Sequence, residues 1–202
     1  MISQQCNHIF NTCIQQYHQT DDVLATIQNP YAVESFDYLL FQKNWVDTIQ
    51  WHLEDIVRNP LINPEDGLAL KRKIDASNQI RTDMVEYIDA YFLHKYAKVQ
   101  ALPNATVNTE SPAWAIDRLS ILALKIYHMK AEVDRTDADE THQKNCFDKL
   151  KILLAQQQDL SQSIDELIID IGNGSKIMKV YKQMKMYNDP SLNPVLYQQV
   201  NK

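Results

Sequence analysis

Apolar residues recur every three to four positions along most of the chain, and this period indicates α-helices that each bury one face. The first stripe predicts a helix over residues 2–18, and its apolar positions are Ile2, Cys6, Ile9, Cys13 and Tyr17. A second stripe predicts a helix that starts near Pro30 and ends before Asn59. Proline suits a first turn, because the N–H that it lacks would have no partner there.

Two further segments carry clear start signals. Asn63, directly before a proline, combines a capping side chain with a first-turn proline and predicts a helix over 64–99. Ser111, also before a proline, predicts a helix over 112–135 in the same way. This helix is apolar on nearly every side, which is typical of a helix at the centre of a protein.

The remainder of the chain completes an all-α pattern without a credible strand pair. A helix is expected over 140–171, where Gly172 supplies a stop signal. Residues 175–187 carry four lysines and no acid, and their spacing predicts a short basic helix. The tail over 188–202 is expected to be irregular or to end in one more turn. The sequence therefore predicts one domain over 1–202, a bundle of five long helices plus a short C-terminal basic helix.

Composition narrows the functional classes. The net charge of −6 argues against a global basic surface for nucleic acid, so no nucleic-acid partner is expected. Only three glycines are present, too scattered for a phosphate-binding glycine loop. No apolar run suggests a transmembrane segment or a signal peptide. The odd number of cysteines (Cys6, Cys13 and Cys146) suggests reduced, mostly buried thiols and a cytoplasmic protein.

The densest polar pattern falls on the second and third predicted helices. His52 and Asp55 lie one turn apart at the edge of an apolar face. A polar stripe runs along the third helix, formed by Lys71, Asp75, Asn78, Thr82, Glu86 and Asp89. This stripe is either a solvated helix flank with i,i+4 charge pairs or the lining of a groove between two antiparallel helices.

If the groove exists, its carboxylates favour a divalent metal. Asp55, Glu86 and Asp89 are the candidate ligands, and Mg²⁺ or Mn²⁺ prefers such oxygen donors. His52 is a candidate base or further ligand, which makes His52, Asp55 and Glu86 the candidate catalytic residues. Glu86 and Asp89 resemble the E-x-x-D element of the bundle nucleotide pyrophosphohydrolases, but the partner E-x-x-E is absent because Arg58 stands three residues after Asp55.

Cations and further polar groups extend the candidate binding site. Arg58, Arg81 and Lys71 are suited to a phosphate or carboxylate, the arginines through their bidentate fork. On the fourth helix, Asp117, Arg118 and His128 interrupt an apolar surface. They either form structural ion pairs with neighbouring helices or add to the wall of the same cavity. The complete candidate ligand-binding set is Arg58, Lys71, Asp75, Asn78, Arg81, Asp117, Arg118 and His128.

Three blocks of the chain carry a family resemblance. They contain Gln50-Trp51-His52, Arg81-Thr82-Asp83 and Ile116-Asp117-Arg118 and are rich in tryptophan, histidine and acids. The chain resembles the bacterial domain-of-unknown-function family 4254 over most of its length. The resemblance implies a helical bacterial protein without an established activity, from a family whose members are encoded near sugar-transfer enzymes of the cell envelope. It assigns no catalytic residues.

Two functional hypotheses follow from the residues. The first is a cytoplasmic protein that binds a small phosphate-bearing ligand between the second, third and fourth helices, with metal-assisted hydrolysis as a further step. The second is a non-enzymatic interaction protein that uses its basic C-terminal helix or an apolar helix face. The sequence leaves open whether the protein is an enzyme, which ligand it takes and whether it forms a homo-oligomer.

Overall fold

The structure is a computed structural model that describes residues 1–184, 186 and 189–198. The five long helices are α1 (Ile2–Tyr17), α2 (Phe36–Val57), α3 (Pro64–Lys95), α4 (Pro112–Val133) and α5 (Glu140–Gly172). The short elements are β1 (Thr106–Val107), β2 (Lys176–Ile177) and α6 (Pro194–Tyr197). The predicted all-α architecture with five long helices is confirmed. Among the described residues, no helix is both long and apolar enough to cross a membrane.

Capping side chains explain where the helices begin. The side chains of Asn63 and Ser111 accept backbone N–H groups of the first turns of α3 and α4, as the sequence predicted. The helix expected to start near Pro30 instead begins at α2, where Ser35 is the cap. Glu34 has a positive φ of 74°, and this left-handed conformation cannot belong to a right-handed helix.

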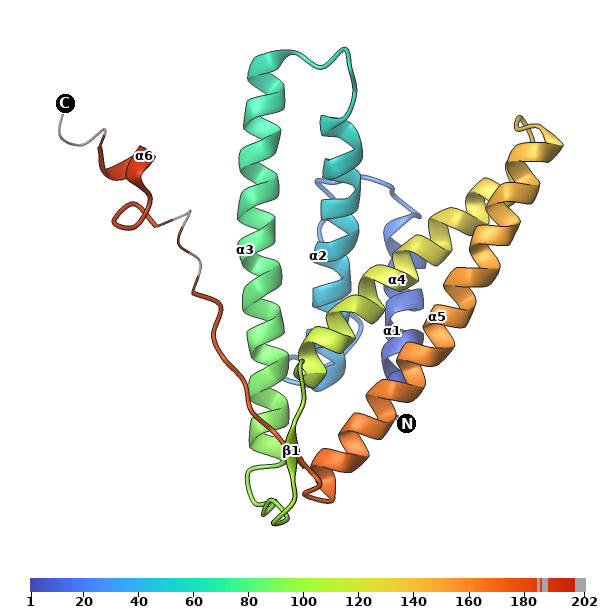
Figure 1. Cartoon of the computed structure of the whole chain (residues 1–202). Coiled ribbons are helices and arrows are strands. Elements are labelled where there is room, and N and C mark those ends of the chain that lie inside the picture. The colour runs from blue at the N-terminus through green and yellow to red at the C-terminus, as the bar shows by residue number, and fades with distance from the viewer. Residues whose placement is uncertain (185, 187–188, 199–202) are drawn as a thin grey trace.

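The five long helices pack as one body around α4 (Figure 1). α2 and α3 lie side by side and antiparallel, and α5 runs back along α4. α4 crosses the bundle obliquely and contacts each of the other four long helices, which confirms its predicted central place. The polar faces of α2, α3 and α4 are thereby brought together.

The main core forms where α1 packs against α2 and α4. At four of the five positions predicted from the sequence stripe, Cys6, Ile9, Cys13 and Tyr17, the side chain is buried, and Ile2 is partly buried. All three cysteines are buried and free, as predicted. A second, smaller core of Leu122, Ile126 and Leu150 joins α4 to α5. Burial of these aliphatic side chains stabilises the fold by roughly 1.5–3 kcal/mol each.

The C-terminal segment differs from the prediction. The basic helix expected over 175–187 is wrong for its described residues, which form β2 and an extended chain (Figure 1). Gly174 causes the change of direction, because its φ of 77° ends helical geometry and its carbonyl accepts the N–H of Leu102. The chain then pairs with β1 in a two-stranded parallel sheet that the sequence did not predict.

Candidate functional site

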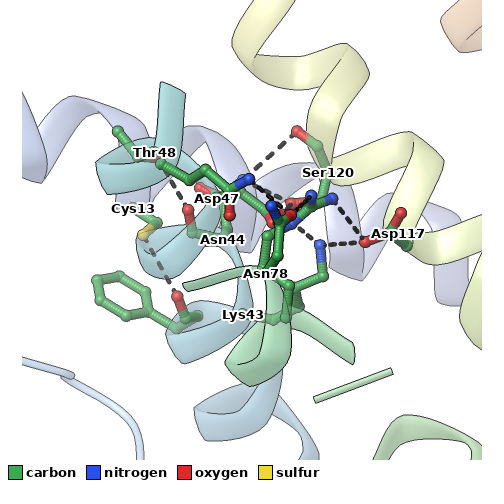
Figure 2. A network of polar contacts seen from close by, with 11 residues as sticks. Cys13, Lys43, Asn44, Asp47, Thr48, Asn78, Asp117 and Ser120 are labelled. Atoms are coloured by element: carbon green, nitrogen blue, oxygen red, sulfur yellow. Dashed lines mark hydrogen bonds and ion pairs between the residues drawn. The ribbon is translucent and has the colours of Figure 1, made fainter. Parts of the chain in front are cut away.

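A network of buried charges connects α2, α3 and α4 (Figure 2). The side chains of Lys43 and Asp47 on α2 are 0% exposed and form an ion pair with each other. Asp47 also accepts hydrogen bonds from the Nε of Arg81, at 2.6 Å, and from the Ser120 hydroxyl. The carboxylate thus receives donors from three helices, which compensates the loss of its hydration.

Asp117 on α4 completes this charged network. Its carboxylate lies 2.6 Å from Lys43 Nζ and 3.3 Å from Arg81 Nη2. Two cations, Lys43 and Arg81, therefore face two carboxylates, Asp47 and Asp117, and the network is neutral. A structural ion pair was one of the two roles considered for Asp117, and the pair is present. The network fixes the relative register of the three helices.

A polar groove opens beside the charged network, with a volume of about 290 Å³. Its lining residues are Asp47, Gln50, Trp51, Glu54, Asp55, Arg58, Arg81 and Ile121. Most of them belong to α2 or, like Arg58, directly follow it, whereas Arg81 belongs to α3 and Ile121 to α4. One hollow of the surface is therefore surrounded by two arginines, a tryptophan and three carboxylates.

The two arginines of the polar groove are held differently. Arg81 is mostly buried, with 23% of its side chain exposed, and its Nη1 also lies 3.4 Å from the side-chain oxygen of Asn78. Burial alone would lower the pKa of Arg81, but the charges of Asp47 and Asp117 and their hydrogen bonds to the guanidinium raise it above its ordinary value. Arg58 is 66% exposed and forms an ion pair of 2.7 Å with Glu54. One guanidinium is thus fixed, while the other can move.

Three histidines from three helices meet next to the polar groove. His18 ends α1, His52 lies on α2 and His128 lies on α4, and one ligand atom of each is within 4.8 Å of the others. The Nε2 atoms of His18 and His52 are 3.3 Å apart. Trp51 lines the groove and stacks in parallel on His128, with 4.8 Å between ring centroids. We call these three residues the histidine cluster.

The environment of the histidine cluster disfavours the charged forms of His52 and His128. Burial, followed by the nearby His18 and His52, lowers the pKa of His128 to about 4. Burial also lowers the pKa of His52, although the carboxylate of Asp21 acts in the opposite direction. A neutral imidazole has one nitrogen with a free lone pair, which can accept a hydrogen bond or bind a metal.

A second group of potential metal ligands lies where α4 meets α5. It consists of Glu132, His142 and Cys146, and we call it the hairpin cluster. The Nε2 of His142 lies 2.8 Å from Glu132 and 3.4 Å from the Cys146 sulfur. Glu132 also pairs with Arg135 at 2.9 Å. The side chains of the hairpin cluster are therefore already paired with one another or with Arg135 through hydrogen bonds and an ion pair.

Comparison with known proteins identifies the family. The chain matches the family described as "Protein of unknown function (DUF4254)" over residues 37–180. The chain belongs to the DUF4254 family. The match runs from the start of α2 to beyond β2 and includes His52, His128 and the whole charged network. Comparisons with curated proteins and with solved structures give no match.

This DUF4254 protein does not bring the three predicted metal ligands together. Asp47 contacts Arg81, and Gln50 contacts Asn78. Because α2 and α3 are antiparallel, a residue that lies one position later on α2 is level with a residue one position earlier on α3. Asp55 is therefore level with about residue 73, and Glu86 lies roughly 13 residues, or about 20 Å, further along α3. Asp55, Glu86 and Asp89 are accordingly not among the described groups that could share one ion.

Asp89 has a different environment from the one expected. Asp89 lies near the Ser111 hydroxyl and the Ala113 N–H at the start of α4, and both groups act to lower its pKa. Its buried Oδ1 has no hydrogen-bond partner among the described residues. A carboxylate is favourable at the N-terminus of a helix, where backbone N–H groups have no partner within the helix. Burial nevertheless raises the pKa of Asp89. This residue joins α3 to α4, at the end of α3 away from the polar groove.

Several predicted ligand residues of the DUF4254 chain lie in solvated ion pairs. Lys71 and Asp75 pair with each other on the exposed surface of α3, as in the solvated-flank alternative. Arg118 pairs with Glu110 and is 60% exposed. By contrast, Asn78, Arg81 and Asp117 converge on the charged network. The polar stripe of α3 is thus solvated at its N-terminal end and buried near its middle.

Sequence reasoning missed three residues of this region: Lys43, Asp47 and His18. A Lys and an Asp four residues apart on a helix ordinarily indicate a surface pair. The signal that could have found them is their position next to Asn44 and Trp45, on a face that carries aromatic residues. His18 has no such signal, because its neighbours in the cluster come from distant parts of the chain.

Proposed function

We propose that the protein binds a small phosphate-bearing ligand, together with a divalent cation, in the polar groove between α2, α3 and α4. The observation that carries the proposal is the position of Arg58, Arg81 and Asp55 around one hollow of about 290 Å³. This volume is close to the lower end of small-molecule sites, which span roughly 300–1,000 Å³. The arginines supply the anion recognition that the ligand requires.

Arg81 supports the proposal because its guanidinium is fixed in place. A guanidinium has five N–H donors. The three nitrogens of Arg81 each donate one hydrogen bond, to Asp47, Asn78 and Asp117. No described residue is bonded to its other donors, which can reach a phosphate oxygen from the groove. A donor that is already ordered loses little entropy when the ligand binds.

The charge balance of the polar groove explains why a cation is included. The charged network is neutral, and Glu54 is paired with Arg58. Asp55 forms no salt bridge with any described residue, so it leaves the groove with one surplus negative charge. A phosphate would be repelled by this carboxylate, whereas Mg²⁺ or Mn²⁺ could be shared between the carboxylate and phosphate oxygens.

Hydrolysis is the reaction that such an arrangement favours. A cation between Asp55 and a phosphate group would polarise the phosphorus and lower the pKa of a bound water. In such a reaction a water oxygen would attack phosphorus, the bridging oxygen would leave with the bonding electrons, and Asp55 would accept the proton of the water. His52 does not line the groove, so this scheme gives Asp55 the role of base, for which His52 was the candidate from the sequence.

The test compares two arginines with similar surroundings. Arg58 and Arg118 are each more than half exposed and each pair with one glutamate, but only Arg58 lines the polar groove. Binding of ADP, a uridine-diphosphate sugar and inorganic phosphate is measured by calorimetry, with and without Mg²⁺ or Mn²⁺. Arg58→Ala is expected to weaken binding about 10- to 100-fold, as for a lost charge-assisted hydrogen bond, and Arg118→Ala less than about 2-fold.

Two results would overturn the proposal. One is that the folded wild-type protein binds none of these probes with either cation. The other is that Arg118→Ala weakens binding as much as Arg58→Ala, which would place the ligand outside the groove. Incubation of the bound nucleotide and analysis for released phosphate then shows whether hydrolysis follows binding.

The alternative function, a non-enzymatic interaction protein, has less support. One of its two forms required a basic helix over 175–187, and the described residues of that segment are extended. The other form relies on an apolar helix face. The exposed apolar residues Phe147 and Leu154 lie seven positions apart on α5, hence on one side of it, and are the observation in its favour.

A further inference from the structure

We propose that His18, His52 and His128 form a binding site for a zinc-like transition metal ion. The site is distinct from the groove cation, because it offers nitrogen rather than oxygen ligands. It holds whether or not the polar groove binds a phosphate. The proposal rests on the spacing of the nitrogens, on the lone pairs that His18 and His128 can offer, and on the contacts that hold each ring.

The spacing of the nitrogens suits a tetrahedral ion. Zn²⁺ binds histidine nitrogen at about 2.0–2.1 Å, and tetrahedral angles then place two ligand nitrogens about 3.3 Å apart. The Nε2 atoms of His18 and His52 are 3.3 Å apart, and a nitrogen of His128 completes a group within 4.8 Å. The third ring needs at most a small adjustment to reach the same ion.

The contacts of His18 and His128 show which of their nitrogens can offer a lone pair to an ion. The Nδ1 of His18 lies 2.7 Å from the Ile14 carbonyl oxygen, and only an N–H can make this contact. In the neutral ring, this contact leaves the Nε2 of His18 with a lone pair, and this nitrogen faces His52. His128 has a buried Nε2 without a hydrogen-bond partner among the described residues. A buried nitrogen without a partner is unfavourable in the protein alone, and coordination would satisfy it.

Aromatic packing and a backbone contact hold each ring in position. His52 stacks on Tyr17 at 5.0 Å, and His128 stacks on Trp51 at 4.8 Å. The carbonyl of Ile14 accepts the Nδ1–H of His18. Metal-binding histidines almost always have such an acceptor for the nitrogen that does not bind the metal. Rings that are fixed before the metal arrives lose little freedom on binding.

The ligand set selects the class of metal. Three imidazoles suit Zn²⁺, Cu²⁺, Co²⁺ or Ni²⁺, whereas Mg²⁺ requires oxygen ligands. The fourth position is open to water or to Asp21, whose carboxylate oxygen lies 3.7 Å from His52 Nε2. Asp21 has a positive φ of 48°, and this backbone conformation turns the chain back toward the cluster after α1. Three histidines with one open position are the arrangement of a reactive rather than a purely structural zinc site.

The hairpin cluster of Glu132, His142 and Cys146 is the alternative location for a metal. There the Nε2 of His142 already contacts both partners, and Glu132 is paired with Arg135. A metal would have to displace that arginine and compete with an existing ion pair. The histidine cluster involves no such displacement, so it is the site that we assign.

The experiment measures metal binding directly. Full-length protein, purified without a histidine tag and stripped with EDTA, is titrated with Co²⁺, whose tetrahedral complexes absorb strongly in visible light, and then with Zn²⁺ as competitor. We expect one ion per chain. His52→Gln and His18→Ala are expected to weaken binding at least about 100-fold, because loss of a ligand costs no less than loss of an outer-shell partner. His142→Ala is the matched control and should bind like the wild type.

Each outcome decides the question. Every variant is first shown to melt cooperatively, and His52→Gln is used because it keeps a polar side chain of similar length. One ion per chain that is lost in His52→Gln and retained in His142→Ala supports the site. No binding by the folded wild type, equal binding by His52→Gln, or loss of binding only in His142→Ala would overturn it. Metal alone is the probe, so failure of the phosphate proposal leaves this result unaffected.

Discussion

The Nε2 atoms of His18 and His52 face each other at 3.3 Å, although 34 positions separate the two residues in the chain. The contact joins the end of α1 to the last third of α2 and lies beside His128 of α4. It brings three imidazoles to the edge of the polar groove through Trp51, which touches both features. The predictions below test the parts of this arrangement separately.

Burial determines how much an i,i+4 pair of Lys and Asp contributes. Lys43 and Asp47 are 0% exposed, whereas Lys71 and Asp75 form the same kind of pair about half exposed. Lys43→Met leaves two buried carboxylates with only Arg81 and should lower the free energy of unfolding by about 3–5 kcal/mol. Lys71→Met should change it by no more than about 0.5 kcal/mol. Urea denaturation measures both, and equal effects would contradict the structural role of the charged network.

Gly174 should be intolerant of substitution, in contrast to Gly67. A Cβ at Gly174 would lie 2.4 Å from the carbonyl oxygen of Gln100, and the positive φ alone costs about 1–2 kcal/mol. Gly174→Ala is therefore expected to destabilise the protein by more than that amount. Gly67→Ala has ordinary contacts and lies in a helix, so it should stabilise by up to about 1 kcal/mol. Thermal melts compare the two, and a harmless Gly174→Ala would refute the described chain reversal.

The stability of the metal-free protein should depend on His128 in weakly acidic solution. Burial lowers the pKa of His128 from 6.5 to about 4, so the folded protein binds fewer protons than the unfolded chain between these pH values. Stability from this residue is therefore complete above about pH 6.5 and decreases as the pH falls toward 4.

The comparison with His128→Gln isolates this contribution from that of the carboxylates. The difference in unfolding free energy between wild type and variant should be constant above neutral pH. It should shift in favour of the variant as the pH is lowered from 6.5 to 4.5. A difference that stays constant over this range would show that His128 is protonated as easily in the folded protein as in the unfolded chain.

The helices could be predicted from the sequence because their signals are local. Asn63 and Ser111 act as caps where the sequence placed them, and the apolar stripe of α1 is the buried face. The segment after Gly174 was predicted wrongly because its lysines and apolar residues fit a helical period. Its extended form depends on pairing with β1, more than sixty residues earlier, which local periodicity does not reveal.

The candidate site could be predicted only in part, because it depends on helix register. Asp55, Arg58 and Arg81 do line one groove, but the contact of Asp47 with Arg81 sets a register that separates Asp55 from Glu86. One residue of slip between α2 and α3 would change every such pairing. The histidine cluster could not be predicted for another reason. His18 lies at the end of a helix, and the other two histidines of the cluster are far from it in the sequence.

The most direct measurement is X-ray diffraction from crystals of the full-length protein loaded with one equivalent of Zn²⁺, recorded on both sides of the zinc absorption edge. We predict one strong anomalous peak among His18, His52 and His128, about 2.0–2.1 Å from a ring nitrogen of each. A peak at Glu132, His142 and Cys146 instead, or no ordered zinc in a well-diffracting crystal, would contradict the assignment of the metal to the edge of the polar groove.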